Sequence, residues 1–199
     1  MLQRVLEALG ALLEDAPVFN RLIEQMKDWG KTQQAAREHL IRVFSNVLAS
    51  FERAHAIVLL ELSRLAAVRS PDEYKTTMAK EIDRDKLYEL FKANDVCAPV
   101  HQLQADLQSG FADIKDSIAL GAANKLSKAL GDFELSEYAL AEDYQKHLSS
   151  VLLSAFKVNT QDDLKQAISE VVDEQGRLSR ELSALTAFKH RLLQLSLYS

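Results

Sequence analysis

The sequence predicts an all-α protein. It contains only 6 glycines and 3 prolines in 199 residues, whereas sandwiches, barrels and parallel sheets need many such residues in their turns. Its 32 leucines and 25 alanines, both strong helix formers, make up more than a quarter of the chain. Apolar residues also recur at steps of three and four, as on one face of a helix. We therefore expect a single domain over 1–199, built of long antiparallel helices in a coiled-coil-like bundle.

The first long helix is expected over about 17–69. Asp15 is suited to cap it, and Pro17 fits its first turn, where a backbone donor is not needed. Further along, apolar residues keep the spacing of a coiled-coil seam. They are Leu40, Phe44, Val47, Phe51, Ala54, Val58, Leu62 and Leu65.

A short polar helical segment is expected over 71–93, in one piece or two. Ser70 can cap it, Pro71 fits the first helical position, and Glu73 completes a capping box. The loop that follows is expected over 94–99.

The second long helix is expected over about 99–157. Gly131 and Asp132 can either end this helix or only bend it. Because no further turn residue follows them, and the apolar spacing continues to Phe156, we expect one long bent helix.

The third long helix is expected over 160–198. Thr160 is its N-cap, and Asp163 takes the capping-box position with a shorter acid than the usual glutamate. Its seam alternates steps of four and three, with Gln175 and Lys189 as the polar members. The seam residues are Leu164, Ile168, Val171, Gln175, Leu178, Leu182, Leu185, Lys189, Leu192 and Leu195.

Bundles only two or three helices thick have much surface for their volume, so we expect a homodimer that completes the core. The candidates for helix packing and the dimer core are Phe44, Phe51, Leu62, Ile114, Ile118, Leu178, Leu182 and Leu185.

The formal net charge of −5 disfavours a nucleic-acid partner, since such proteins are usually basic. The single cysteine, Cys97, fits a reducing compartment. The first ten residues make a poor signal peptide, and the apolar stretch Ala54–Val68 is too short and too charged to cross a bilayer. We expect a cytoplasmic protein, peripheral where it meets a membrane.

No pattern of catalytic residues stands out. Glu52 and His55 form one E-x-x-H pair, whereas di-iron bundles need two such pairs and two more carboxylates. Cys97 lies four residues before His101, but the region lacks a glycine-rich turn to stabilise an oxyanion. We expect no enzyme activity, no cofactor and no metal.

Lysines on the predicted second helix could face anionic lipid headgroups, where each is worth about 1 kcal/mol. The lipid-facing candidates are Lys115, Lys125, Lys128, Lys146 and Lys157. The competing interpretation is a solvated face of mixed charge, because an acidic run over 132–143 interrupts them.

Segment 13–20, LEDAPVFN, resembles the L-x-D-S-P-x-F-R segment near the start of BAR domains joined to PH and ArfGAP domains or found in endosomal adaptors. Ala16 replaces the usual serine and Asn20 the usual arginine. Segments 111–133 and 182–186 are similar to the family's second and third helices. The third helix is shorter than in the family, which would make this chain a partial or truncated member.

The resemblance implies a crescent-shaped dimer that binds curved anionic membranes and recruits small GTPases or other proteins. We therefore expect a non-enzymatic dimeric scaffold that associates weakly and peripherally with such membranes, recruits partner proteins, or does both. The alternative is a closed helical bundle that serves as a protein-interaction adaptor without a membrane role.

Overall fold

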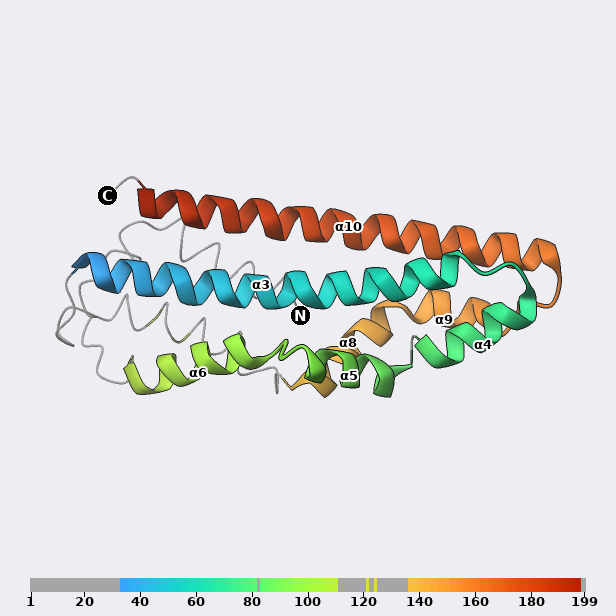
Figure 1. The fold of residues 1–199 in the computed structure, drawn as a ribbon, viewed down its shortest axis with the longest axis horizontal. Coiled ribbons are helices and arrows are strands. Elements are labelled where there is room, and N and C mark those ends of the chain that lie inside the picture. The colour runs from blue at the N-terminus through green and yellow to red at the C-terminus, as the bar shows by residue number, and fades with distance from the viewer. Residues whose placement is uncertain (1–32, 82, 111–120, 122–123, 125–135, 198–199) are drawn as a thin grey trace. The chain divides into compact units, whose positions relative to one another are not determined.

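The computed structural model describes residues 33–81, 83–110, 121, 124 and 136–197. Every regular element in this part of the chain is an α-helix (Figure 1), so the prediction of an all-α fold is confirmed. In chain order the helices are α3 (Gln33–Ala66), α4 (Pro71–Glu81), α5 (Arg84–Ala93), α6 (Ala98–Gly110), α8 (Glu137–His147), α9 (Ser149–Ala155) and α10 (Gln161–Leu197).

The chain divides into two compact units. The first comprises Met1–Ser50, Cys97–Leu135 and Ala187–Ser199, and the second comprises Phe51–Val96 and Ser136–Thr186. Helices α3 and α10 each contribute residues to both units. The domain expected over 1–199 is therefore made of two units, and neither is continuous in sequence.

The described core of the first unit comes from α3, α6 and the end of α10. Its buried apolar side chains are Ile41, Val43, Phe44, Val47, Leu48, Cys97, Val100, Leu103 and Leu192. They follow the apolar spacing along α3, and α6 adds one buried residue per turn.

In the second unit, α5 packs on α8 and α4 packs on α9. Two side-chain hydrogen bonds tie α3 to α10, from Gln175 to Ser63 at 2.9 Å and from Thr186 to Glu52 at 2.9 Å. Residue numbers rise along α3 as they fall along α10, so the two helices are antiparallel over this stretch.

The predicted segment 71–93 forms two helices. Ser70 Oγ accepts from the Glu73 amide, as expected, but the Glu73 carboxylate accepts from the Arg69 amide instead of that of Ser70. Asp83 caps α5 by accepting from the Asp85 amide.

Helix α5 ends in a Schellman motif. Asp95 adopts a left-handed φ of 47°, which lets the Val96 amide donate to the Phe91 carbonyl at 3.1 Å. Phe91 and Val96 are both buried, as is usual for the two apolar residues of this motif. The loop ends two residues earlier than predicted, because α6 already begins at Ala98.

The continuous helix predicted over 99–157 is wrong. Ser136 has extended backbone angles, and its hydroxyl accepts from the Ala139 amide, so α8 begins there with a regular N-cap. A serine followed by Glu137 is a helix start signal that the analysis of Gly131 and Asp132 overlooked. A further junction at Leu148 separates α8 from α9.

Helix α10 begins as predicted, with a reciprocal capping box. Thr160 Oγ1 accepts from the Asp163 amide at 3.2 Å, and the Asp163 carboxylate accepts from the Thr160 and Asn159 amides. These bonds to the charged form lower the pKa of Asp163.

The buried stripe of α10 differs from the predicted seam. It runs through Leu164, Ala167, Val171, Leu178 and Leu185. Ile168, Gln175, Leu182 and Lys189, which we placed in the seam, are half-buried. The physical reason is that Glu174 and Glu181 occupy the inner positions of this stripe, where the apolar pattern of the sequence is interrupted.

Most of the predicted core residues that the structure describes are buried. Phe44, Phe51, Leu62, Leu178 and Leu185 are buried, and Leu182 is half-buried. Ile114 and Ile118 lie outside the described residues. A role for any of them in a dimer stays a prediction.

Within the described residues, Ile41–Ala66 of α3 is long and apolar enough to cross a membrane by length and composition alone. It begins well before Ala54, so the apolar stretch is longer than expected from the sequence. Half of its most apolar window is buried inside the protein, and it includes the buried polar residues His55 and Glu61. These features are those of a core helix.

Replacing Asp163 with alanine is expected to lower the free energy of unfolding at pH 7, because the capping acceptors are lost. Since the folded pKa is lowered, this stabilisation exists above the unfolded pKa and disappears as pH falls through the folded pKa. Urea unfolding at several pH values checks it. A deficit that persists unchanged at strongly acidic pH would contradict the charge contribution.

Leu178→Ala is expected to cost about 2–5 kcal/mol, because it removes a side chain that is 1% exposed. Leu182→Ala should cost clearly less, since Leu182 is half-buried. Chemical denaturation of the two variants measures the difference, and equal costs would place the buried stripe of α10 elsewhere.

Candidate functional site

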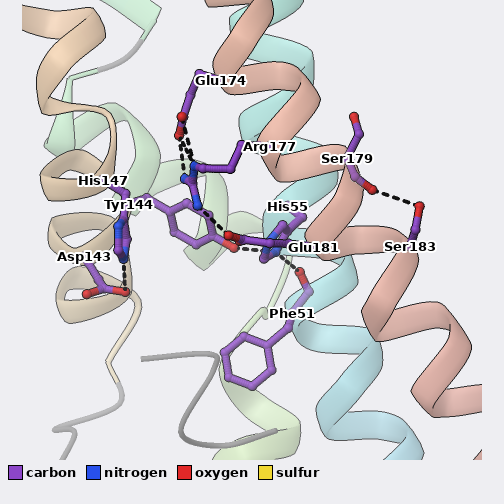
Figure 2. A network of polar contacts seen from close by, with 10 residues as sticks. All are labelled: Phe51, His55, Asp143, Tyr144, His147, Glu174, Arg177, Ser179, Glu181 and Ser183. Carbon is purple, nitrogen blue, oxygen red and sulfur yellow. Dashed lines mark hydrogen bonds and ion pairs between the residues drawn. The ribbon is translucent and has the colours of Figure 1, made fainter.

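A buried polar network in the second unit joins α3, α8 and α10 (Figure 2). At its centre lies His55 of α3, whose exposed fraction is 1%. Its Nδ1 lies 2.7 Å from the Tyr144 hydroxyl of α8, and its Nε2 lies 3.2 Å from Glu181 Oε2 of α10. The same Nδ1 lies 3.0 Å from the Phe51 carbonyl, one turn back on α3.

The partners of His55 specify where its protons lie. Nε2 must donate, because the Glu181 carboxylate can only accept. Nδ1 lies near the Phe51 carbonyl, which can accept, and the Tyr144 hydroxyl, which can donate. Both ring nitrogens of His55 therefore have a hydrogen-bond partner.

Tyr144 stays protonated in this environment. Burial raises the pKa of its hydroxyl well above the ordinary value, and the charges of Glu181 and Asp143 raise it further, whereas Arg177 lowers it. Its ring meets the His55 ring edge-on, with centroids 5.5 Å apart, and contacts the Phe91 ring at 5.6 Å. The hydroxyl is therefore a fixed hydrogen-bonding group held by packing on both sides.

Arg177 completes the network by joining two glutamates of its own helix. Its Nε donates to both Glu174 carboxylate oxygens, at 3.0 and 2.9 Å, and its Nη1 donates to Glu181 Oε1. The hydrogen bonds to Glu174 raise the pKa of the guanidinium, so it stays charged. Glu174 lies three residues before Arg177 and Glu181 four after, which places all three on one face of α10.

The sequence analysis found His55 but missed Tyr144, Glu174, Arg177 and Glu181. A signal existed, since Glu174 and Glu181 are seven residues apart and replace apolar residues in the inner stripe of α10. Two carboxylates at equivalent heptad positions indicate a buried cationic partner. Arg177, three residues after Glu174 and four before Glu181, is readable as their partner from the sequence. The contacts of His55 with Glu181 and Tyr144 were not predictable, because they depend on how α3, α8 and α10 pack together.

The predicted Glu52 and His55 pair does not act as a unit. Glu52 accepts from Thr186 Oγ1 on α10, whereas His55 turns to Tyr144 and Glu181. Among the described residues, no three histidine, cysteine or acidic side chains form a group that could hold a metal. Cys97 is buried at the start of α6 and His101 is exposed, so this pair does not line a shared open site.

The network resembles an acid–base relay in its order of groups, from carboxylate to imidazole to hydroxyl. Such a relay needs a hydroxyl that can reach a substrate and lose its proton readily. Tyr144 is 7% exposed, and its pKa is raised rather than lowered. The arrangement is therefore suited to join three helices through polar contacts.

Of the lipid-facing candidates, Lys115, Lys125 and Lys128 lie outside the described residues. Lys146 and Lys157 are exposed, and Lys146 forms an ion pair with Glu142 at 3.0 Å. The structure places two apolar side chains between them in sequence, Leu153 and Phe156, which are 63% and 83% exposed.

Four exposed residues, which we call the α8–α9 stripe, follow one another along α8, α9 and the turn after α9: Lys146, Leu153, Phe156 and Lys157. Phe156 is the C-cap of α9, and the amide of Lys157 donates to the Ser154 carbonyl in the turn that follows. Helix α9 itself contains no acidic residue.

Comparison with known proteins found no matching family model, no matching curated protein and no matching solved structure. The resemblance to BAR domains therefore stays a prediction.

Tyr144→Phe is expected to lower the free energy of unfolding by about 1–2 kcal/mol at pH 7, because His55 loses a buried hydrogen-bond partner. Since the folded pKa of Tyr144 is raised, the wild type alone loses additional stability as pH rises above the ordinary tyrosine range. The gap between the two proteins should thus narrow in alkali. Denaturation curves from pH 7 upward measure it, and a constant gap would contradict the raised pKa.

Proposed function

We propose that this chain is a non-enzymatic helical scaffold that acts as a dimer and docks peripherally on anionic membranes. The observation that carries the proposal is the α8–α9 stripe, in which two exposed apolar side chains lie between two lysines. Phe156 is 83% exposed, and a large aromatic group in water is typical of a contact surface.

The chemistry of the stripe matches a lipid surface. Leu153 and Phe156 can enter the boundary between headgroups and acyl chains, while Lys146 and Lys157 stay at the level of the anionic headgroups. Each lysine near such a surface is worth about 1 kcal/mol. The net charge of −5 opposes long-range attraction, so the binding is expected to be weak and sensitive to salt.

A non-enzymatic role is supported by the state of the polar residues. His55, Tyr144, Glu181 and Arg177 bind one another, and the two at the centre are closed off from solvent. Groups used in this way hold helices together.

A protein-interaction adaptor without a membrane role is the alternative, with the stripe contacting an apolar groove of another protein. Helix-in-groove contacts use apolar anchor residues such as these. The experiment below separates the two, because only the membrane proposal requires lipid charge.

The wild type is expected to sediment with vesicles rich in phosphatidylserine at low salt, and to be released by about 0.5 M salt, where the Debye length falls to about 4 Å. Phe156→Ser and Lys157→Glu should each weaken binding about tenfold, because they remove an inserting group or reverse a charge. Vesicle sedimentation over a range of lipid concentrations measures this.

Matched controls are available. Leu193→Ser removes another exposed apolar side chain, and Lys86→Glu reverses another exposed charge, and neither residue belongs to the α8–α9 stripe. Neither should change binding. If the wild type does not sediment with anionic vesicles at low salt, the membrane proposal is wrong and the adaptor function replaces it.

A further inference from the structure

A second surface, on the other side of α10 from the polar network, presents uncharged exposed side chains. Helix α3 contributes Ala56, Leu60 and Ser63 to it, and α10 contributes Val172, Ser179 and Ser183, all exposed. We call these six residues the neutral face. Leu60 and Val172 are 54% and 51% exposed. In Figure 2 the Ser179–Ser183 pair lies on the side of α10 turned away from His55.

The neutral face extends over both helices. On α3 its residues are spaced by four and three, and on α10 by seven and four, so each set keeps to one side of its helix. The Gln175–Ser63 hydrogen bond joins the two sides at the middle of the face. Charge borders the face on α10 within the step of seven, where the exposed Arg180 guanidinium lies 3.6 Å from the position that a Cβ on Gly176 would take.

Two of the three serine hydroxyls of the neutral face donate to backbone carbonyls. Ser183 Oγ donates to the Ser179 carbonyl at 2.9 Å, and Ser63 Oγ donates to the Leu59 carbonyl at 2.8 Å. Covering these hydroxyls with another helix therefore leaves their protons bonded, which removes most of the usual cost of burying them. Small alanine and serine side chains also allow helix axes to approach closely.

We propose that the neutral face binds the neutral face of a second copy of this chain, which rests on the dimeric scaffold proposed above and names its interface. The charges at the two edges favour a second copy over another partner. Exposed Arg64 borders the face on α3, and exposed Asp173 borders it on α10. Because Ser63 lies beside Gln175, these two opposite charges lie at nearly the same level along the helices.

A two-fold axis along the helix pair would place α3 of each copy over α10 of the other. Such a rotation does not change the position of a residue along the helix axes. Arg64 of one copy would therefore meet Asp173 of the other, and symmetry would form this pair twice. Leu60 and Val172 would be covered in a four-helix contact. Arg64 keeps its bonds to buried Glu61, at 2.9 and 3.0 Å, which fixes its position at the edge.

Light scattering coupled to size exclusion tests the proposal on the full chain. The wild type is expected at twice the 22.3 kDa chain mass. Leu60→Asp and Val172→Asp should each shift it to the monomer mass, because two buried carboxylates would face each other or apolar groups. Asp173→Arg should weaken the dimer at least tenfold, and less so at high salt. Leu153→Asp, an equally exposed apolar position outside the face, should remain dimeric.

Circular dichroism should show the same helix content for all variants. Ser179→Arg tests the same interface by placing a charge at a polar position of the face. A wild-type dimer that persists in both Leu60→Asp and Val172→Asp overturns this interface and leaves the dimeric scaffold standing. A wild type that is monomeric at every concentration overturns the interface and the dimer together. Vesicle binding by the α8–α9 stripe is measured in a separate experiment, so its result does not depend on the interface or on the dimer.

Discussion

The central constraint on the second unit is that α10 turns two carboxylates toward the packed side beside His55, Glu174 with its side chain 11% exposed and Glu181 with 41% exposed. A carboxylate in such a position is costly unless it is paired and hydrogen-bonded. Arg177 pairs with both Glu174 and Glu181, and Glu181 also binds His55. The His55–Glu181 and His55–Tyr144 contacts are the ones that join different helices, so they hold α3, α8 and α10 in one register, because a shift by one turn would leave the buried imidazole without them. Apolar packing alone would tolerate such a shift more easily.

The inward side of α10 is mostly apolar, through Leu164, Ala167, Val171, Leu178 and Leu185, with Glu174 and Glu181 as the charged members beside His55. Its outward side beside α3 carries Val172, Ser179 and Ser183. Helix α8 gives Tyr144 to the interior, while α9 and the turn after it expose Leu153 and Phe156.

Much of the fold was predictable from local signals. Thr160 and Asp163 marked the start of α10, and Ser70 with Pro71 marked that of α4, because caps depend on a few adjacent residues. The start of α8 at Ser136 was missed, since the apolar spacing around it continues smoothly and competed with the cap signal. Half of the predicted seam of α10 is buried, including Leu164, Leu178 and Leu185. Its half-buried members were misplaced, because Glu174 and Glu181 look solvent-facing until Arg177 and His55 are seen beside them. Surface features such as Phe156 were not predictable, because exposure depends on which helices cover which.

The discontinuity of the two units has a consequence for how the chain folds. His55 and Glu181 are separated by 126 positions, so their contact closes a long loop, at an entropic cost of about 4 kcal/mol plus a constant. Helices such as α4 and α5 can form early from local contacts, within microseconds. The polar network can form only after the distant ends of the chain have met. Assembly of the second unit is therefore expected to be the slow step. Glu174, Arg177 and Glu181 of α10 stay exposed to water until that step is complete.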